Sequence, residues 1–198
     1  MSFQTIFDIQ QSMTVNNRRM VGQQIARSGY MTVAQYLTAV PWVFTIVPHN
    51  YLYYPDVRNV IQAIDNKDRQ LPEVISFAGS NLSWFVKMQG TATSATLNGA
   101  PTPNTQNLNL TSNGTFKAGD FIMINGYTYK ITEDSDGSVV NIHRPLIGAP
   151  SSGTTVYMGT QCTFNVVAEK CPTYTLTPMT NGAYVNWDDA FVFREDIT

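Results

Sequence analysis

The sequence GDFIMINGYTYKITEDSDGSVVNIHRPL, at residues 119–146, constrains the fold more than any other part of the chain. Residues 121–124 are typical of one strand, and residues 127–132 of the strand that returns beside it. Asn125-Gly126 between them is a favoured hairpin turn, because both residue types tolerate a positive φ. A second turn at residues 134–137 leads into a third strand. The segment predicts a small β-module in which no side chain is arranged for chemistry.

Composition predicts a folded chain with few charges. Hydrophobic residues make up 43% of the 198 residues, which is enough for a core, whereas charged residues make up 13% and the formal net charge is −2. A protein that neutralises nucleic-acid phosphates needs a basic surplus, so we expect no specific nucleic-acid binding. The amino terminus lacks a signal-peptide pattern, and no window approaches the roughly 20 apolar residues of a membrane span. We therefore expect no membrane insertion, and free thiols at Cys162 and Cys171 in a reducing cytoplasm.

The rest of the chain predicts strands and one helix. Residues 42–47, WVFTIV, lie between two prolines and predict a strand with two apolar faces, which lies in a core or against a neighbouring chain. Residues 55–69 predict a helix that covers the sheet, because Pro55 fits the first turn and apolar residues recur at helical spacing. The early segment predicts strands joined by a turn at residues 28–30, although residues 22–26 fit a helix as well.

A change in composition near Gly90 suggests an insertion. The chain then becomes almost uncharged and rich in Thr, Ser, Asn and Gly. We expect residues 91–160 to form an inserted small SH3-like or OB-like β-barrel, and residues 1–90 and 161–198 to form a discontinuous parent β domain. Two consecutive all-β domains are the alternative.

No constellation of residues predicts catalysis. A Ser–His–Asp relay would have to recruit His49 or His143 from a distance. The cluster at residues 134–137 resembles the opening of a calcium loop, but it lacks the bidentate acid at the end of such a loop. Asp188-Asp189, with Glu195 and Asp196, could in principle serve glycoside hydrolysis, but adjacent side chains on a strand or turn point in different directions. We therefore expect a solvated acidic edge or an inter-subunit salt-bridge surface. We predict that the chain is not an enzyme and has no catalytic residue, cofactor or metal site.

Aromatic residues crowd the first third of the chain. In an extended tract of residues 51–54, YLYY, successive side chains point to opposite faces, so at least one tyrosine faces outward. Such residues fill a thick single-chain core, or they are buried against identical subunits. For the second interpretation we nominate these oligomer-interface residues: Arg27, Tyr30, Tyr36, Tyr51, Tyr53 and Tyr54.

These features resemble bacteriophage long-tail structural proteins of the tail-tube, tube-initiator and distal baseplate-hub group. The resemblance rests on Arg27-Ser28-Gly29 in an early hairpin, Pro41-Trp42 at the start of an aromatic strand, a helix at residues 56–67, and an aromatic strand at residues 191–195 that ends in Glu. The unit beginning GDFIMING also resembles small barrels of virion tail proteins. The resemblance covers about two thirds of the chain.

The resemblance implies a tail-tube-like β-barrel or β-sandwich, copies of which form a ring, usually a homohexamer, around a channel. It implies assembly in the host cytoplasm and a final place in the virion, beside tail tube and baseplate proteins. The added barrel departs from a minimal tube protein, which favours a distal tube or baseplate-hub component. The alternative is a carbohydrate- or host-receptor-binding module of the tail tip that uses the same aromatic residues as a sugar platform, for which variants of Trp42, Trp84 and Trp187 would be the test.

Overall fold

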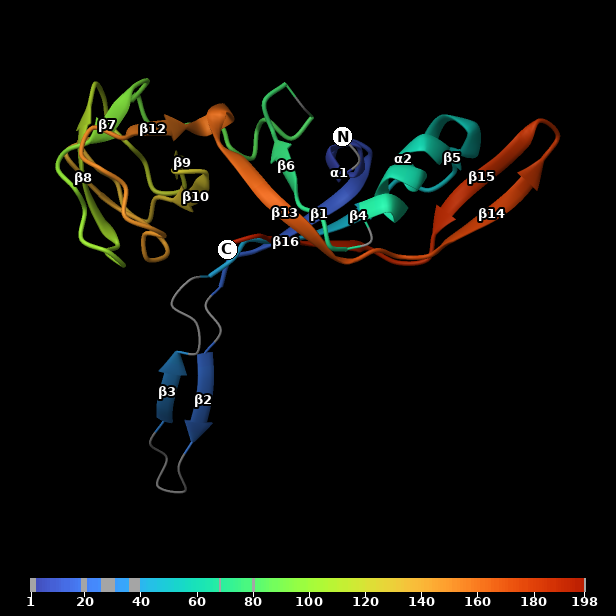
Figure 1. Ribbon diagram of the computed structural model, residues 1–198, viewed down its shortest axis with the longest axis horizontal. Helices are drawn as coiled ribbons and strands as arrows, with labels where there is room; N and C mark the ends of the chain where they lie inside the picture. The colour runs from blue at the N-terminus through green and yellow to red at the C-terminus, as the bar shows by residue number, and fades with distance from the viewer. Residues whose placement is uncertain are drawn as a thin grey trace.

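The computed structural model describes residues 3–18, 21–25, 31–35, 40–67, 69–79 and 81–197, with backbone alone for 21–25 and 31–35. This part of the chain is mainly β, with two α-helices (Figure 1). The elements in chain order are α1 (Phe3–Asp8), β1 (Gln10–Asn16), β2 (Val21–Ile25), β3 (Met31–Gln35), β4 (Val43–Pro48), β5 (Leu52–Tyr53), α2 (Tyr54–Lys67), β6 (Glu73–Ser76), β7 (Ala95–Leu97), β8 (Asn107–Ser112), β9 (Phe121–Ile124), β10 (Tyr127–Lys130), β11 (Val139–Asn141), β12 (Thr155–Met158), the 3₁₀ helix η1 (Gly159–Gln161), β13 (Thr163–Lys170), β14 (Tyr174–Met179), β15 (Gly182–Trp187) and β16 (Phe191–Glu195).

The centre of the molecule is a five-stranded antiparallel sheet in the order β1-β4-β16-β13-β6, which we call the parent sheet. Side chains alternate between its faces, so that Phe44 and Ile46 of β4 lie in the core while Val47 is exposed. The predicted core position of residues 42–47 is therefore confirmed for one face of the strand. Burial of the other face against a neighbouring chain stays a prediction. The core face is dominated by aromatic side chains, among them Phe3, Phe7, Phe44, Phe77, Phe164, Phe191 and Phe193.

Two helices pack on the sheets, where the sequence predicts one. The predicted helix is α2, which contacts β5 and β15 and buries Ile61 and Ile64. The additional helix is α1, which contacts β4 and β6 of the parent sheet. Its Phe3, Ile6 and Phe7 are fully buried on one helical stripe. The prediction of a single covering helix is thus wrong. Six residues give too short an apolar pattern to distinguish a helix from another buried segment.

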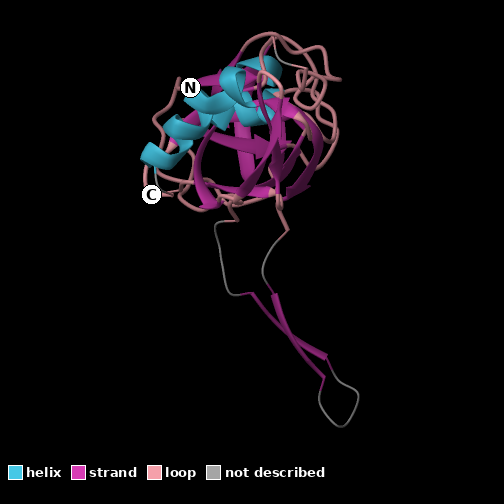
Figure 2. Cartoon of the chain, turned by 90° about the vertical axis from the view of Figure 1, so that its right-hand side faces the viewer, coloured by secondary structure: helices cyan, strands magenta, loops and turns pink. Residues whose placement is uncertain are grey.

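Two hairpins extend from the body of the protein. Strands β2 and β3 pair antiparallel and lie away from the sheets (Figures 1 and 2). The extended backbone of Val21–Ile25 excludes the helical alternative for that stretch, whereas the predicted turn at residues 28–30 lies outside the described residues. Strands β14 and β15 form the second hairpin, which joins β5 in a three-stranded sheet at one end of the long axis.

A second, six-stranded sheet has the order β10-β9-β12-β7-β8-β11, and we call it the insertion sheet. It curls, because a bridge between Ile131 and Ile142 joins the ends of its two outer strands. The β9–β10 hairpin turns at Asn125 and Gly126 with φ of 51° and 83°, which confirms the turn expected from the sequence. Its core includes Leu108, Ile122, Ile124, Tyr129, Val140 and Val156.

Strand β9 belongs to both hydrophobic cores. All four of its residues are buried. Phe121 and Met123 pack into the core of the parent sheet, whereas Ile122 and Ile124 pack into the core of the insertion sheet. Because side chains alternate along a strand, one apolar run of four residues supplies two separate cores and connects them.

A buried ion pair fixes the two sheets to each other. Arg144, next to the insertion sheet, donates from Nη2 to Oε1 of Glu195 at 2.7 Å and from Nη1 to Oε2 at 2.5 Å. The same guanidinium donates to the carbonyl oxygens of Val40 (2.7 Å) and Thr128 (2.9 Å). The backbone N–H of Trp42 donates to Oε2 of Glu195 at 3.0 Å. Both charged side chains lie away from water, so each depends on the other for its solvation.

We predict that Ile61→Asp strongly destabilises the protein, because the substitution places a carboxylate on the buried stripe of α2. The expected loss in the free energy of unfolding is about 3–5 kcal/mol, measured by urea denaturation. Asn59→Asp is the matched control, since Asn59 is an exposed residue of the same helix and receives the same charge. Equal midpoints for the two variants would contradict the packing of α2.

We predict that Arg144→Met lowers the free energy of unfolding by about 3–5 kcal/mol, because it leaves the carboxylate of Glu195 buried without its cation. Arg194→Met is the control, since Arg194 lies next to Glu195 on β16 but pairs with Glu169 at the surface. That exposed pair contributes about 0–1 kcal/mol. Adding Glu195→Gln to Arg144→Met should recover part of the loss, and a cost no larger than that of the control would show that the buried pair is unimportant.

Candidate assembly surface

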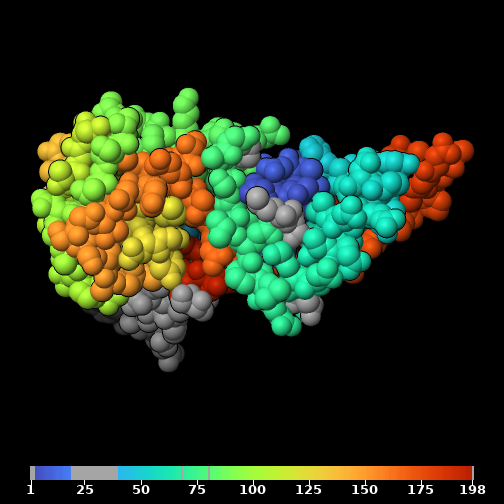
Figure 3. Space-filling model, turned by 45° about the horizontal axis from the view of Figure 1, so that its top comes forward, coloured from blue at the N-terminus to red at the C-terminus, as the bar shows by residue number. Residues whose placement is uncertain are grey.

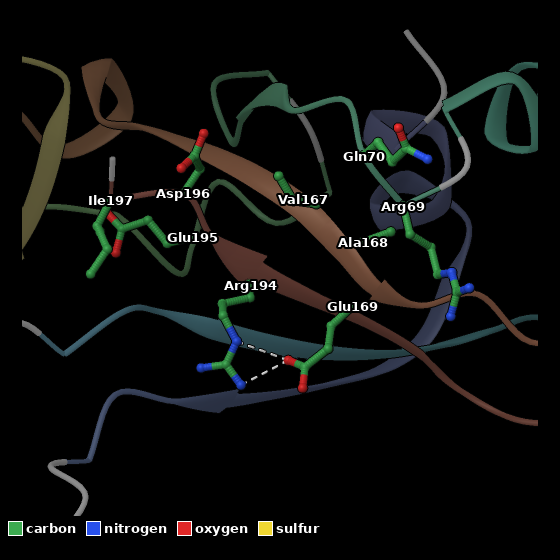
Figure 4. A pocket seen from close by; sticks show the side chains of 9 residues that line it. All are labelled: Arg69, Gln70, Val167, Ala168, Glu169, Arg194, Glu195, Asp196 and Ile197. Carbon is green, nitrogen blue, oxygen red and sulfur yellow. Dashed lines mark hydrogen bonds and ion pairs between the residues drawn. The ribbon is translucent and has the colours of Figure 1, made fainter. Parts of the chain in front are cut away.

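A hollow of about 630 Å³ lies where β13 and β16 meet the chain that follows α2 (Figure 4). Arg194 reaches across to Glu169, with Nε and Nη2 at 2.9 and 2.8 Å from Oε2, so these two charges neutralise each other. The carboxylate of Glu195 is held by Arg144. No lining residue supplies a hydroxyl, thiol or imidazole that could act as a nucleophile or base. The lining residues are Arg69, Gln70, Val167, Ala168, Glu169, Arg194, Glu195, Asp196 and Ile197.

The acidic turn of the insertion has structural partners. Asp134 accepts hydrogen bonds from Lys117 Nζ and the backbone N–H of Ala118, and these bonds, led by that of Lys117, lower the pKa of its carboxyl. Asp136 accepts from the hydroxyl and backbone N–H of Ser138, which likewise lowers its pKa. The bonds of Asp136 are the local bonds of a turn, whereas those of Asp134 tie the turn to residues 117 and 118. In the part of the chain that the structure describes, no three His, Cys, Asp or Glu side chains gather to hold a metal ion.

His143 has a packing role. Its Nδ1 accepts a hydrogen bond from the backbone N–H of Lys130 at 3.0 Å, and its ring lies 5.0 Å from that of Trp42. His49, the other histidine, follows β4, and its backbone N–H donates to the carbonyl oxygen of Ile9. The two histidines therefore belong to different parts of the structure.

The six residues nominated for an interface fall into three groups. Arg27, Tyr30 and Tyr36 lie outside the described residues. Tyr51 is 70% exposed and has a φ of 61°, while Tyr53 and Tyr54 are half-buried. The expectation of one extended tract is wrong, because α2 begins at Tyr54 and Tyr51 adopts a left-handed conformation.

The β14–β15 hairpin gathers exposed apolar side chains, and we call its residues 172–187 the arm. Leu176, Met179 and Tyr184 on the arm are 42%, 40% and 36% exposed, and the ring of Tyr51 packs edge-on against that of Tyr184 at 6.2 Å. No residue of the arm is charged. Strand β14 also forms the outer edge of its sheet. An uncharged, apolar edge of this kind is a surface suited to a protein partner.

The arm is anchored at both its base and its tip. At the base, Lys170 pairs with Asp189, and this hydrogen bond, aided by the backbone N–H of Ala190, lowers the pKa of the Asp189 carboxyl. Near the tip, the hydroxyl of Tyr53 donates to the carbonyl oxygen of Asn181 at 2.6 Å. The hairpin itself is predicted by the sequence, with strands at residues 174–176 and 184–187 and a turn at residues 180–182, and the antiparallel pairing of β14 with β15 confirms it. Its role as an exposed apolar surface was missed, although its lack of charge is visible in the sequence.

The tryptophans do not form the predicted sugar platform. Trp42 is 1% exposed, and its Nε1 donates to the carbonyl oxygen of Thr128 at 2.8 Å. Trp187 is half-buried between Tyr174 and Phe191, with ring centroids at 5.4 and 4.9 Å. Only Trp84 among the three is well exposed, at 64%. Trp42 is therefore not accessible to a sugar in the single chain.

Comparison with known proteins does not assign the chain to a family. No protein-family model matches it, and no curated protein matches it. In the described residues, no helix is both long and apolar enough to cross a membrane. The resemblance to tail proteins thus stays a prediction, and the candidate assembly surface rests on the described residues of the chain itself.

Burial raises the pKa of two groups in the cores. The pKa of Tyr129 is raised to about 12, mainly by burial, although the backbone N–H of Ile147 and the charge of Arg144 oppose the shift. Burial also raises the pKa of the Cys162 thiol. Neither Cys162 nor Cys171 takes part in a disulfide, as the sequence predicts.

We predict that the protein loses stability between pH 10 and about 12. Below pH 10 Tyr129 is protonated in both states, so its contribution is intact. Above pH 10 the unfolded chain ionises at this tyrosine while the folded chain does not, which lowers the free energy of unfolding by on the order of 2 kcal/mol. Tyr129→Phe should lose less stability over this interval than the wild type or the exposed control Tyr157→Phe. Parallel curves of urea midpoint against pH would contradict it.

Proposed function

We propose that this chain is a virion structural protein of a bacteriophage tail, which forms a homo-oligomeric ring at the distal tube or baseplate hub. The observation that carries the proposal is the arm, an uncharged hairpin with exposed Leu176, Met179 and Tyr184 next to an exposed Tyr51. Interfaces are enriched in aromatic residues and Met and depleted of charge. In the surface hollow at the C-terminal strand, by contrast, two of the three carboxylates, those of Glu169 and Glu195, are paired with arginines.

The architecture supports this proposal. In this proposal the parent sheet with α1 and α2 is the tail-tube-like unit, and the curled insertion sheet is the small SH3-like or OB-like barrel. The β2–β3 hairpin extends well clear of the body, where it can reach a neighbouring subunit (Figure 2). Mechanism in such a protein means assembly, in which each copy buries apolar surface against the next. Six copies are the ring order that the resemblance implies.

Adjacent tail tube and baseplate proteins are the proposed further partners. The insertion sheet lies at one end of the long axis, beyond the parent sheet, so it presents a separate surface to proteins around the ring (Figure 1). Such an addition fits a position where the symmetry or diameter of the tail changes.

Binding of a carbohydrate or host receptor is the second candidate function, favoured by Trp84 alone. Its indole is 64% exposed and packs edge-on against Phe85 at 6.2 Å, so one ring face can stack on a sugar. A glycan array with the wild type and Trp84→Ala tests it. Binding that disappears in the variant would favour this function over a ring component.

We predict that Tyr51→Ser weakens ring formation by about 1–3 kcal/mol per contact and leaves thermal stability nearly unchanged, because Tyr51 is exposed in the single chain. Tyr53→Ser is the comparison, since Tyr53 packs on the arm at Gly182 and donates to Asn181, so its loss lowers the melting temperature. Light scattering gives the oligomer mass, and calorimetry gives the melting temperature.

Electron microscopy of the purified protein tests the ring itself. Closed rings whose mass is a multiple of the 22.0 kDa chain support the proposal. A monomer at all salt and protein concentrations, also in the presence of extracts that contain other tail proteins, would contradict it.

A further inference from the structure

We propose that the arm of one copy binds in a groove on the outer face of the insertion sheet of a second copy. The groove has a volume of about 480 Å³ and lies over β7, β8 and β12. Its lining residues are Thr93, Ser94, Ala95, Thr96, Thr111, Ser112, Asn113, Thr155, Val156, Tyr157, Met158 and Gln161. The inference deepens the proposed ring by naming the two surfaces that meet, and to that extent rests on it.

The first argument is the chemistry of the groove. None of its twelve lining residues is charged, and most present a hydroxyl or amide group. Tyr157 on β12 is 45% exposed and supplies an aromatic surface between them. A charged partner would lose its hydration in this groove without meeting an opposite charge, so the groove favours an uncharged occupant.

The second argument is that the arm has matching chemistry. From Pro172 to Trp187 it carries no charge, and it alternates threonines with larger apolar residues. Leu176, Met179 and Tyr184 offer apolar surface, while Thr177 offers a hydroxyl to the hydroxyl and amide groups of the groove. No charge would be buried on either side of the contact, which removes the largest cost of forming it.

The third argument is position. The arm and the groove lie at opposite ends of the long axis of the molecule (Figures 1 and 3). A copy therefore cannot bind its own arm. Because the two surfaces differ, their contact is head-to-tail, and repeated head-to-tail contacts close into a ring or continue as a filament.

Pro178 favours insertion of side chains over addition of a strand. Strand β14 forms an open edge, but Pro178 has no N–H to donate to a neighbouring strand. Continuous backbone pairing along the edge is thereby interrupted. Side chains on both sides of Pro178 remain exposed and can enter a groove.

Cross-linking between two variants tests the contact directly. In a Cys171→Ser background, Thr177→Cys on the arm and Thr111→Cys in the groove are purified separately, mixed, and oxidised with copper phenanthroline. We expect a covalent dimer that contains one chain of each kind. Thr177→Cys mixed with Asn59→Cys on α2 is the matched control, because Asn59 is also exposed but lies outside the groove. Equal cross-linking of both mixtures would overturn the proposal.

A charge exchange tests the contact energetically. Leu176→Lys and Thr111→Glu each place one charge in the uncharged contact, so each should raise the dissociation constant at least tenfold. The double variant should regain association at low salt, because the two charges then meet in neighbouring copies. All three variants should keep the wild-type melting temperature, since both positions are exposed in the single chain. If one variant does not fold, the cross-linking experiment still decides.

The outcomes separate this inference from the proposed ring. Rings that persist in Leu176→Lys with an unchanged dissociation constant overturn the arm-and-groove contact and leave the ring standing. Selective cross-linking into open filaments supports the contact and contradicts the ring. A wild type that stays monomeric, with no selective cross-link at millimolar concentration, overturns both. Saturable binding of a glycan that blocks cysteine modification at Thr111→Cys, without any cross-linked dimer, also overturns the contact.

Discussion

The buried pair of Arg144 and Glu195 is the interaction on which the arrangement of the molecule depends. It joins residues 51 positions apart and lies where the insertion sheet meets the end of β16. Both groups of the pair also bond to the backbone, at Val40, Trp42 and Thr128. An apolar replacement would remove the partners of the Val40 carbonyl and the Trp42 N–H, so here the charges specify one geometry that apolar packing alone would not.

The same junction explains why a chain with so few charges can hold two sheets in one orientation. Strand β9 gives Phe121 and Met123 to one core and Ile122 and Ile124 to the other, so neither sheet can move without disturbing both. The groove and the arm are consequently held at a fixed distance on opposite sides of the parent sheet. A fixed distance between two complementary surfaces is what determines the curvature of a head-to-tail assembly.

Local signals were readable in the sequence, and long-range ones were not. The turn at Asn125-Gly126 and the helix α2 follow from residue types within a few positions of each other, and both are present. Whether a face of β4 is covered depends on elements that are distant in the sequence, so the residues of β4 alone do not predict it. Partners of Arg144 are equally invisible, since nothing near residue 144 indicates a carboxylate at residue 195. Of the nominated interface residues, only Tyr51 is largely exposed among those described.

The placement of charge gives the clearest distinction between surfaces made to stay in water and surfaces made to be covered. Lys170 and Asp189 pair at the base of the arm, and Arg194 and Glu169 pair on the open face of the parent sheet. Between Pro172 and Trp187 there is no charged residue, although an open edge strand is normally protected by charged side chains as well as by proline. Pro178 alone protects against indiscriminate strand pairing. Pro178 prevents continuous backbone pairing along β14, whereas the apolar side chains of that strand stay exposed. Such an edge favours a partner with a complementary surface over any other strand. The uncharged groove at the other end of the molecule has the matching chemistry.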